Sequence, residues 1–300
     1  MKNLFFFCSL LTFFQFSSIF AADTPAHLTL ARADNLSTHS AESGLWNQLN
    51  PDNLKLRSAA ALVVDQSGRP IYAKQVDTPR PIASITKLMT AMVVLDTKLP
   101  MQERISITKD DRDLLRLTGS RLQYGATLTR QQLVQLALLA SENRAASALA
   151  RTYPQGRQAF VQAMNDKARA LGMHDSRFTD PAGLDAGNVA SPRDLMKMMR
   201  AAGKYPLIRH ATTTRSTSVR PWKERGELTF GNTNRLLGNK RWEIQLGKTG
   251  YINEAGRCLV LQTKIAGQPV YIVLLNSFGK LTPYADSNRI RKWIEQAAKS

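Results

Sequence analysis

Cysteine and histidine are scarce in this chain, which has two cysteines and four histidines among 300 residues. No histidine falls in an H-E-x-x-H pattern or another metal-ligand spacing, so we expect no bound metal. A phosphate-binding glycine loop is also lacking, no Ser-His-Asp triad can be assigned, and we expect no cofactor. Cys258 lies in an apolar, strand-like run and is expected to be a buried side chain rather than a nucleophile.

Acidic residues are few compared with basic ones. The chain has 23 Asp and Glu against 41 Lys and Arg, a formal net charge of +18, and the basic residues are dispersed. The electrostatic field of such a positively charged protein attracts nucleic acid, anionic lipid or an acidic polymer. For an exported protein we expect no nucleic acid, and cell-wall polymers and membrane surfaces are the natural partners. Peripheral membrane contact stays open, as does a role in solubility alone.

Long apolar runs are missing after the first 22 residues. Before that point, Lys2 precedes an almost wholly apolar stretch, Leu4–Phe20, which ends in Ala21 and Ala22. This order is typical of a secretory signal peptide, which we assign to 1–22. A membrane anchor is the alternative, but the run of about 17 residues is at the lower limit for a span. We expect an exported, periplasmic protein that is soluble or peripheral.

The remaining pattern predicts a leader segment at 23–55 and one catalytic domain at 56–300. Strands are expected first, then a block of helices, then three strands and a final helix at 284–299. Segregated strands and helices indicate an α+β fold, with one antiparallel sheet and helices packed on it. The expected strands are 59–64, 71–74, 244–246, 257–265 and 270–276, and the expected helices are 84–99, 129–140, 144–152, 156–171 and one that opens at Ser191. Thr129 and Ser191 are expected to be N-caps, and the final helix is expected to carry Ile290, Trp293 and Ile294 on one face.

Three short motifs carry residues suited to catalysis: Ser84-Ile85-Thr86-Lys87, Ser141-Glu142-Asn143 and Lys248-Thr249-Gly250. Ser84 heads the most apolar helix, where amide N–H groups favour developing negative charge. Lys87 shares a helical face with it, and a buried lysine can act as a base.

The S-x-x-K pattern also occurs at Ser106–Lys109 and Ser277–Lys280. A charged, solvated run follows Ser106, and a glycine follows Ser277 two residues on, unlike a serine that opens a long helix. We therefore assign the nucleophile to Ser84.

The other two motifs are weaker when taken singly. Ser141 and Asn143 lie in a turn between helices, where a capping turn is the simpler interpretation. Lys248 and Gly250 share one face of a predicted strand, so the glycine is expected to leave that face open for a ligand. Lys248 with the hydroxyl of Thr249 could hold a carboxylate, whereas a strand-end turn is the structural alternative.

In this order and context the motifs resemble those of the low-molecular-mass penicillin-binding proteins, the D-alanyl-D-alanine carboxypeptidase and endopeptidase family. The resemblance covers roughly residues 50–280. It implies a β-lactamase/transpeptidase-like fold with a helical cluster and a C-terminal helix on the sheet. The segments that carry it are Pro81–Thr90, Asp180–Leu184 with Asn188, Gly247–Tyr251 and Glu254–Val260.

The resemblance implies a role for each motif residue. Ser84 would attack a D-alanine carbonyl, Lys87 would take its proton, and Ser141 would relay a proton to the leaving amine. Asn143 would hydrogen-bond the substrate backbone. The implied site is catalytic Ser84, Lys87 and Ser141 with substrate-binding Asn143, Lys248, Thr249, Gly250 and Tyr251.

In the same resemblance, Lys248 and Thr249 bind the substrate carboxylate, and the backbone N–H groups of Ser84 and Tyr251 form the oxyanion hole. Peptidoglycan peptide stems are the implied substrate and β-lactams the implied covalent inhibitors. Roles in cell-wall biogenesis and cell shape follow from that substrate.

Two departures point to the endopeptidase branch typified by penicillin-binding protein seven, which cuts D-alanyl–diaminopimelate cross-links. Glu142 stands where the best-known carboxypeptidases have glycine, and the chain ends soon after the final helix. A DD-carboxypeptidase with the same motifs and a non-catalytic wall-binding protein remain the alternatives. A β-lactamase is disfavoured because no E-x-x-L-N segment is present.

Overall fold

A five-stranded antiparallel sheet separates two layers of helix in the computed structural model, which describes residues 44–299. The expected signal peptide and residues 23–43 of the expected leader lie outside the described residues. The strand order is β2-β1-β11-β10-β9, so β9 and β2 form the edges. The strands are β1 (Ser58–Asp65), β2 (Pro70–Lys74), β9 (Glu243–Ile252), β10 (Gly256–Ile265) and β11 (Gln268–Ser277).

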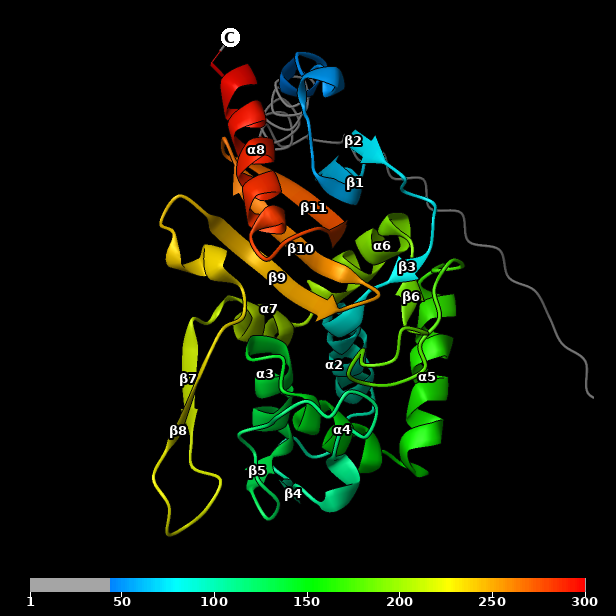
Figure 1. Cartoon of the computed structure of the whole chain (residues 1–300), viewed down its shortest axis with the longest axis vertical. Helices are drawn as coiled ribbons and strands as arrows, with labels where there is room; N and C mark the ends of the chain where they lie inside the picture. Colours follow the sequence, from blue (N-terminus) through cyan, green and yellow to red (C-terminus); the bar gives the residue numbers. More distant parts are fainter. Residues whose placement is uncertain (1–43, 300) are drawn as a thin grey trace, which may run out of the picture. The chain divides into compact units, whose positions relative to one another are not determined.

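The inner strands are buried on both faces, and successive side chains point to opposite layers. In β1, Ala61 and Val63 face one apolar cluster, while Leu62 and Val64 face the other. Helix α8 (Thr282–Ala297) packs on β1, β10 and β11 from the first side, and α6 (Pro192–Ala202) packs on the same strands from the second (Figure 1). The sheet is therefore the middle layer of the domain.

Helix α2 (Lys87–Asp96) forms the centre of the helical layer. Every residue from Lys87 to Val94 is buried, as expected for a helix that is apolar all round. The surrounding helices are α3 (Arg130–Leu139), α4 (Asn143–Arg151), α5 (Gly156–Ala170) and α7 (Pro206–Thr213). The short elements are η1 (Pro51–Asn53), β3 (Arg80–Pro81), η2 (Ala83–Thr86), β4 (Arg104–Ser106), η3 (Lys109–Asp111), β5 (Thr127–Thr129), β6 (Val189–Ala190), β7 (Ser216–Val219), β8 (Leu228–Gly231) and η4 (Arg235–Gly238).

The α+β class is confirmed, and several local signals are confirmed with it. Thr129 caps α3 by accepting a hydrogen bond from Gln132 N, and Ser191 caps α6 by accepting one from Asp194 N. Two details differ: Ser84 lies in the 3-10 turn η2 before α2, and β9 is much longer than the expected 244–246. The β7–β8 hairpin, which projects from the helical layer (Figure 1), was not among the expected strands.

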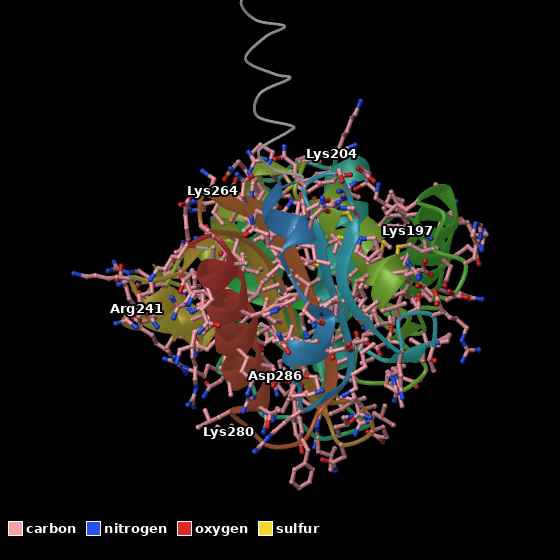
Figure 2. The ribbon with its side chains drawn as sticks, turned by 90° about the horizontal axis from the view of Figure 1, so that it is seen from above. Lys197, Lys204, Arg241, Lys264, Lys280 and Asp286 are labelled. Atoms are coloured by element: carbon pink, nitrogen blue, oxygen red, sulfur yellow. The ribbon has the colours of Figure 1, made fainter. Side chains whose placement is uncertain are left out.

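Within residues 44–299 no helix combines the length and apolarity needed to cross a bilayer. The basic side chains are spread over the surface, and Figure 2 shows Lys197, Lys204, Arg241, Lys264 and Lys280 around the whole outline. The dispersed charge expected from the sequence is therefore confirmed for the described residues.

The carboxylate of Asp286 fastens α8 to the start of β1. It is fully buried and accepts hydrogen bonds from Arg57 N (3.0 Å), Ser58 N (2.7 Å) and Ser58 Oγ (2.7 Å). Arg289, one turn along α8, donates to its other oxygen at 2.6 Å. One side chain thus accepts from the backbone N–H groups of two successive residues, and the one on Ser58 is buried.

We expect Asp286→Ala to lower the free energy of unfolding by about 3 kcal/mol, because buried donors lose their acceptor. Urea unfolding followed by circular dichroism measures the change. The matched control is Asp166→Ala, which removes an exposed ion pair with Arg169 and should cost no more than about 0.5 kcal/mol. Equal effects of the two substitutions would contradict the anchoring role.

Candidate active site

Ser84 and Lys87 meet at the junction of η2 and α2. Lys87 Nζ lies 2.8 Å from Ser84 Oγ, as their spacing of three residues predicted. Ser84 remains partly exposed while Lys87 is fully buried. Ala83, immediately before the serine, has a φ of 49°, which for a residue other than glycine costs on the order of 1 kcal/mol. The turn is thus held in a strained conformation that presents the hydroxyl.

Three neutral oxygens surround the amine of Lys87. Besides Ser84 Oγ, it donates to Asn143 Oδ1 (2.8 Å) and to the carbonyl oxygen of Ala182 (2.6 Å). Burial lowers the pKa of Lys87 from 10.5 to about 7, and the charges of Asp180, Glu142 and Asp113 offset part of that effect. Near neutral pH a large fraction of this lysine is an uncharged amine, able to accept a proton.

Ser141 and Asn143 occupy the turn between α3 and α4. Ser141, two residues after the end of α3, has a φ of 59°, and a hydrogen bond from Glu142 N to the Leu136 carbonyl (3.2 Å) closes the turn. Asn143 then opens α4 and donates from Nδ2 to Thr118 Oγ1 (3.0 Å). Its amide oxygen faces Lys87, so the turn orients the lysine as well as presenting Ser141.

Lys248 reaches the same turn from the edge strand β9. Its Nζ donates to Ser141 Oγ at 3.0 Å, and the residue is only 1% exposed. Burial, with a smaller contribution from the charge of Lys87, lowers the pKa of Lys248 well below 10.5. Thr249 Oγ1 lies 2.7 Å from Thr233 Oγ1 beside the site. The first and third motifs are therefore joined through the second.

Gly250 plays a different part from the one expected. A Cβ at this position would lie 2.7 Å from the carbonyl oxygen of Ile82 and 3.1 Å from Ser84 N. The face that the sequence predicted to be open for a ligand is occupied by the backbone of η2. Glycine is needed here because β9 passes so close to the serine's own backbone.

The loop 180–188 supplies the carbonyl of Ala182 and was noted in the sequence only as a family-like segment. Asp180 shapes it by accepting from Ala182 N (2.6 Å), Gly183 N (2.7 Å) and Asp185 N (2.8 Å). Asn188, fully buried, donates to Asp180 Oδ2 at 2.5 Å. A carboxylate that gathers successive backbone amides is a recognisable turn signal, but the sequence does not show which carbonyl faces the lysine.

The two competing serines lie elsewhere. Ser106 ends β4 on the surface, where its Oγ lies 2.8 Å from Thr127 Oγ1. Ser277 is buried in β11, with its Oγ 2.7 Å from Ser58 Oγ. Neither lysine of those repeats hydrogen-bonds its serine in the described residues.

A hollow of about 450 Å³ opens beside Ser84. Ser141, Asn143, Thr249 and Gly250 also line it, so the three motifs share one cavity. Of its outer wall, only Tyr251 was named as a site residue from the sequence. That wall consists of Asn232, Thr233, Arg235, Tyr251, Arg257, Cys258, Lys280, Pro283 and Tyr284.

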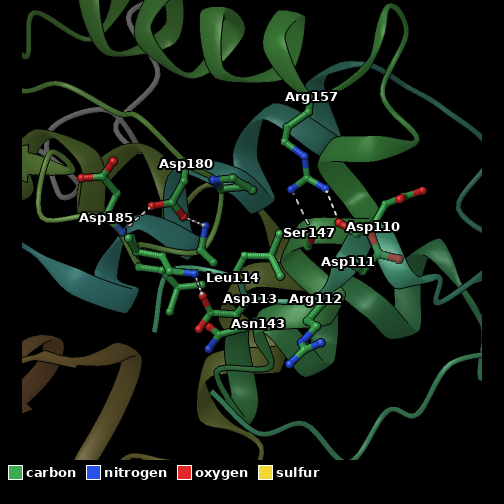
Figure 3. A pocket seen from close by; sticks show the side chains of 14 residues that line it. Asp110, Asp111, Arg112, Asp113, Leu114, Asn143, Ser147, Arg157, Asp180 and Asp185 are labelled. Carbon is green, nitrogen blue, oxygen red and sulfur yellow. Dashed lines mark hydrogen bonds between the residues drawn. The ribbon is translucent and has the colours of Figure 1, made fainter. Parts of the chain in front are cut away.

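A second hollow of about 350 Å³ lies on the other side of Asn143 (Figure 3). Five aspartates line it, and they are bonded to the chain itself: Asp113 accepts from Leu115 N and Arg116 N, both at 2.9 Å. Arg157 donates to Ser147 Oγ (2.9 Å) across the same wall. The aspartates that line this hollow therefore stabilise the loops around the site.

Glu142 and Cys258 are both buried near these residues. Burial raises the pKa of Glu142, and Ser120 donates a hydrogen bond to its carboxylate. Burial likewise raises the pKa of the Cys258 thiol to about 11, which makes it a poor nucleophile at neutral pH. Among residues 44–299, no group of three metal-ligating side chains comes together.

Comparison with known proteins gives a family match over most of the domain. Residues 47–279 match the family model described as D-alanyl-D-alanine carboxypeptidase. The chain is 48% identical over 246 residues to a D-alanyl-D-alanine endopeptidase of Pseudomonas aeruginosa, covering 82% of this chain and 79% of the relative. It is 44% identical over 242 residues to an Escherichia coli protein of the same name, covering 80% and 78%.

Solved structures show the same architecture. The crystal structure of the Streptomyces K15 DD-transpeptidase superimposes with a TM-score of 0.74 at 28% sequence identity, covering 80% of this chain and 97% of that one. This likeness confirms the transpeptidase-like fold that the motif resemblance implied.

We expect Gly183→Ala to disrupt the site. Gly183 has a φ of 75°, and an added Cβ would lie 1.9 Å from the carbonyl oxygen of Ala83, next to Ser84. The loop must move, and we expect a loss of at least about 2 kcal/mol of stability, with loss of the covalent labelling of Ser84 by a β-lactam. Thermal unfolding and labelling with fluorescent penicillin measure the two effects.

The matched control is Gly238→Ala, since a Cβ at Gly238 has no neighbour within 4 Å and its φ is not positive. That variant should unfold and label like the parent protein. Normal labelling of Gly183→Ala would show that the loop does not constrain the serine.

Proposed function

The chain belongs to the D-alanyl-D-alanine carboxypeptidase family, and on this premise we propose that it is a serine DD-endopeptidase of peptidoglycan. It hydrolyses D-alanyl–diaminopimelate cross-links through an acyl-enzyme on Ser84 and is inhibited by β-lactams. The observation that carries the proposal is the buried amine of Lys87, which lies 2.8 Å from the hydroxyl of the partly exposed Ser84. No other S-x-x-K serine in the described residues has this contact.

In the acylation step Ser84 Oγ attacks the carbonyl carbon of the D-alanine before the cross-link, and Lys87 accepts the hydroxyl proton. Asn143 Oδ1 and the Ala182 carbonyl keep the amine in place. The backbone N–H groups of Ser84 and Tyr251 donate hydrogen bonds to the oxyanion. Both belong to the place where β9 passes close to η2, at Gly250.

Departure of the leaving amine requires a proton, which Ser141 delivers. The proton that Lys87 took from Ser84 replaces the one given by Ser141, so Lys87 is a neutral amine again before deacylation, while the hydrogen bond from Lys248 Nζ orients the Ser141 hydroxyl. Thr249 at the cavity wall binds the carboxylate beside the cut bond. Asn143 has a second amide hydrogen, beyond the one given to Thr118, for a substrate carbonyl. Water then cleaves the ester, with Lys87 again as base, and restores Ser84.

Endopeptidase rather than carboxypeptidase activity is supported by the two relatives described above, which carry that name at 48% and 44% identity. Glu142 in the second motif is consistent with the same branch. The carboxypeptidase reaction uses the same machinery and is the alternative. A non-catalytic role is disfavoured by the assembled hydrogen bonds of the three motifs.

We place the enzyme in the periplasm, with residues 1–22 as signal peptide and 56–300 as catalytic domain. The N-terminal apolar pattern and the peptidoglycan substrate support this location. The anionic wall polymer is the partner that suits the dispersed basic surface, with peripheral contact to a membrane as a second use of it. Nucleic acid is not a partner in this proposal.

The reaction of Ser84 with a β-lactam should rise through a pH near 7, because only the neutral amine of Lys87 accepts the proton. Glu142→Gln removes a negative charge that raises the pKa of Lys87, so the midpoint should move to lower pH. Stopped-flow acylation from pH 5 to 9 (roughly two units either side of that pKa) measures it.

Glu243→Gln is the matched control, because Glu243 lies at the far end of β9, paired with Lys264. Its profile should coincide with that of the parent. A shift of Glu142→Gln to higher pH would mean that the carboxyl is uncharged and acts on Lys87 in another way.

A digest of defined muropeptides tests the activity itself. Cross-linked dimers and pentapeptide monomers are incubated together with the mature protein and read by mass spectrometry. We expect dimers to become monomers while pentapeptides persist, and Ser84→Ala to abolish both this conversion and penicillin labelling.

Loss of one alanine from pentapeptides with dimers intact would establish the carboxypeptidase instead. Labelling that persists in Ser84→Ala would move the nucleophile elsewhere, and Ser106 would be substituted next.

A further inference from the structure

Three cations with no acidic partner face the active-site hollow beyond Thr249. Arg235 comes from η4, Arg257 from β10, and Lys280 from the turn between β11 and α8. The hollow has no carboxylate among its lining residues, and within residues 44–299 none of the three cations forms an ion pair. Their charge is therefore not used to hold the fold together.

The three side chains line the same hollow as two aromatic residues, Tyr251 and Tyr284. The guanidinium of Arg257 stacks 3.7 Å from the centroid of the Tyr251 ring. Tyr284 Oη donates to the Thr233 carbonyl (3.2 Å), and the charges of Arg235 and Arg257 both lower its pKa against the larger effect of burial. Stacking fixes the plane of Arg257 and leaves its N–H edges for an anion.

A DD-carboxypeptidase and a DD-endopeptidase release leaving groups of different charge. A pentapeptide releases D-alanine, which has one carboxylate, and Thr249 is placed to bind it. A cross-link releases a stem in which diaminopimelate carries the equivalent carboxylate beside the released amine, and the neighbouring glutamate and the C-terminal D-alanine add further carboxylates. Additional cations next to Thr249 favour only the second kind of leaving group.

We infer that Arg235, Arg257 and Lys280 form a subsite for the additional carboxylates of the leaving stem, and that this subsite sets the preference for cross-linked substrates. The inference rests on the proposed peptidase function and identifies the residues behind its specificity. The anion is a peptide carboxylate of the strand whose amine is released.

The test compares kcat/KM for a cross-linked dimer with that for a pentapeptide, in the full mature enzyme. The triple substitution of Arg235, Arg257 and Lys280 by Gln should lower the dimer/pentapeptide ratio roughly tenfold, mainly through KM, and Arg257→Gln alone by a few-fold. Arg257→Lys, which keeps the charge, should restore most of the ratio.

Arg241→Gln is the matched control for general attraction of an anionic polymer. Arg241 is exposed just before β9 and does not line the hollow. Its ratio should equal that of the parent. An equal fall in Arg241→Gln, or an unchanged ratio in the triple variant, would overturn the subsite.

A second arm removes the charge from the substrate. In a second set of dimers the distal carboxyl groups of the leaving stem are amidated. The parent enzyme should cleave them as slowly as the triple variant cleaves the normal dimer. The triple variant should cleave normal and amidated dimers at the same rate. The inference would also be refuted if the parent enzyme, like the triple variant, cleaved normal and amidated dimers at the same rate. A parent enzyme that cleaves no dimer at all would instead refute the proposed function, so the two failures are distinguishable.

Discussion

The burial of the Lys87 amine without a carboxylate in contact is the constraint on which the site depends. An ammonium has three hydrogens to donate, and three neutral oxygens accept them, from Ser84, Asn143 and Ala182. Neutral acceptors replace lost hydration only in part, so the uncharged amine is favoured and the pKa falls to about 7. A carboxylate in direct contact would stabilise the ammonium and remove the base.

Those three oxygens come from separate parts of the chain, so the base exists only in the folded protein. The backbones must approach closely where they meet, which explains glycine at 183 and 250. Ala83 and Ser141 adopt left-handed conformations that non-glycine residues rarely take. The buried helix α2 and the sheet between two apolar layers stabilise the fold enough to offset this local cost.

Sequence patterns were informative where a few neighbouring residues decide the structure. The i, i+3 spacing of Ser84 and Lys87, the caps at Thr129 and Ser191, and the apolar face of α8 are of this kind. The Ala182 carbonyl, 95 residues from Lys87, and the cations of the outer wall follow from tertiary packing. The sequence predicted that Gly250 keeps a strand face open for a ligand, whereas the structure shows the backbone of η2 against it. Local sequence cannot predict this contact, because η2 is far away along the chain.

Charge on the two sides of Ser84 is used differently. On the Asn143 side the aspartates accept hydrogen bonds from their own loops, so their carboxylates stabilise those loops. On the Thr249 side Arg257 and its neighbours have no acidic partner among the described residues. At the proposed subsite an anionic leaving stem is therefore drawn to the Thr249 side alone, because the five aspartates on the other side would repel its carboxylates.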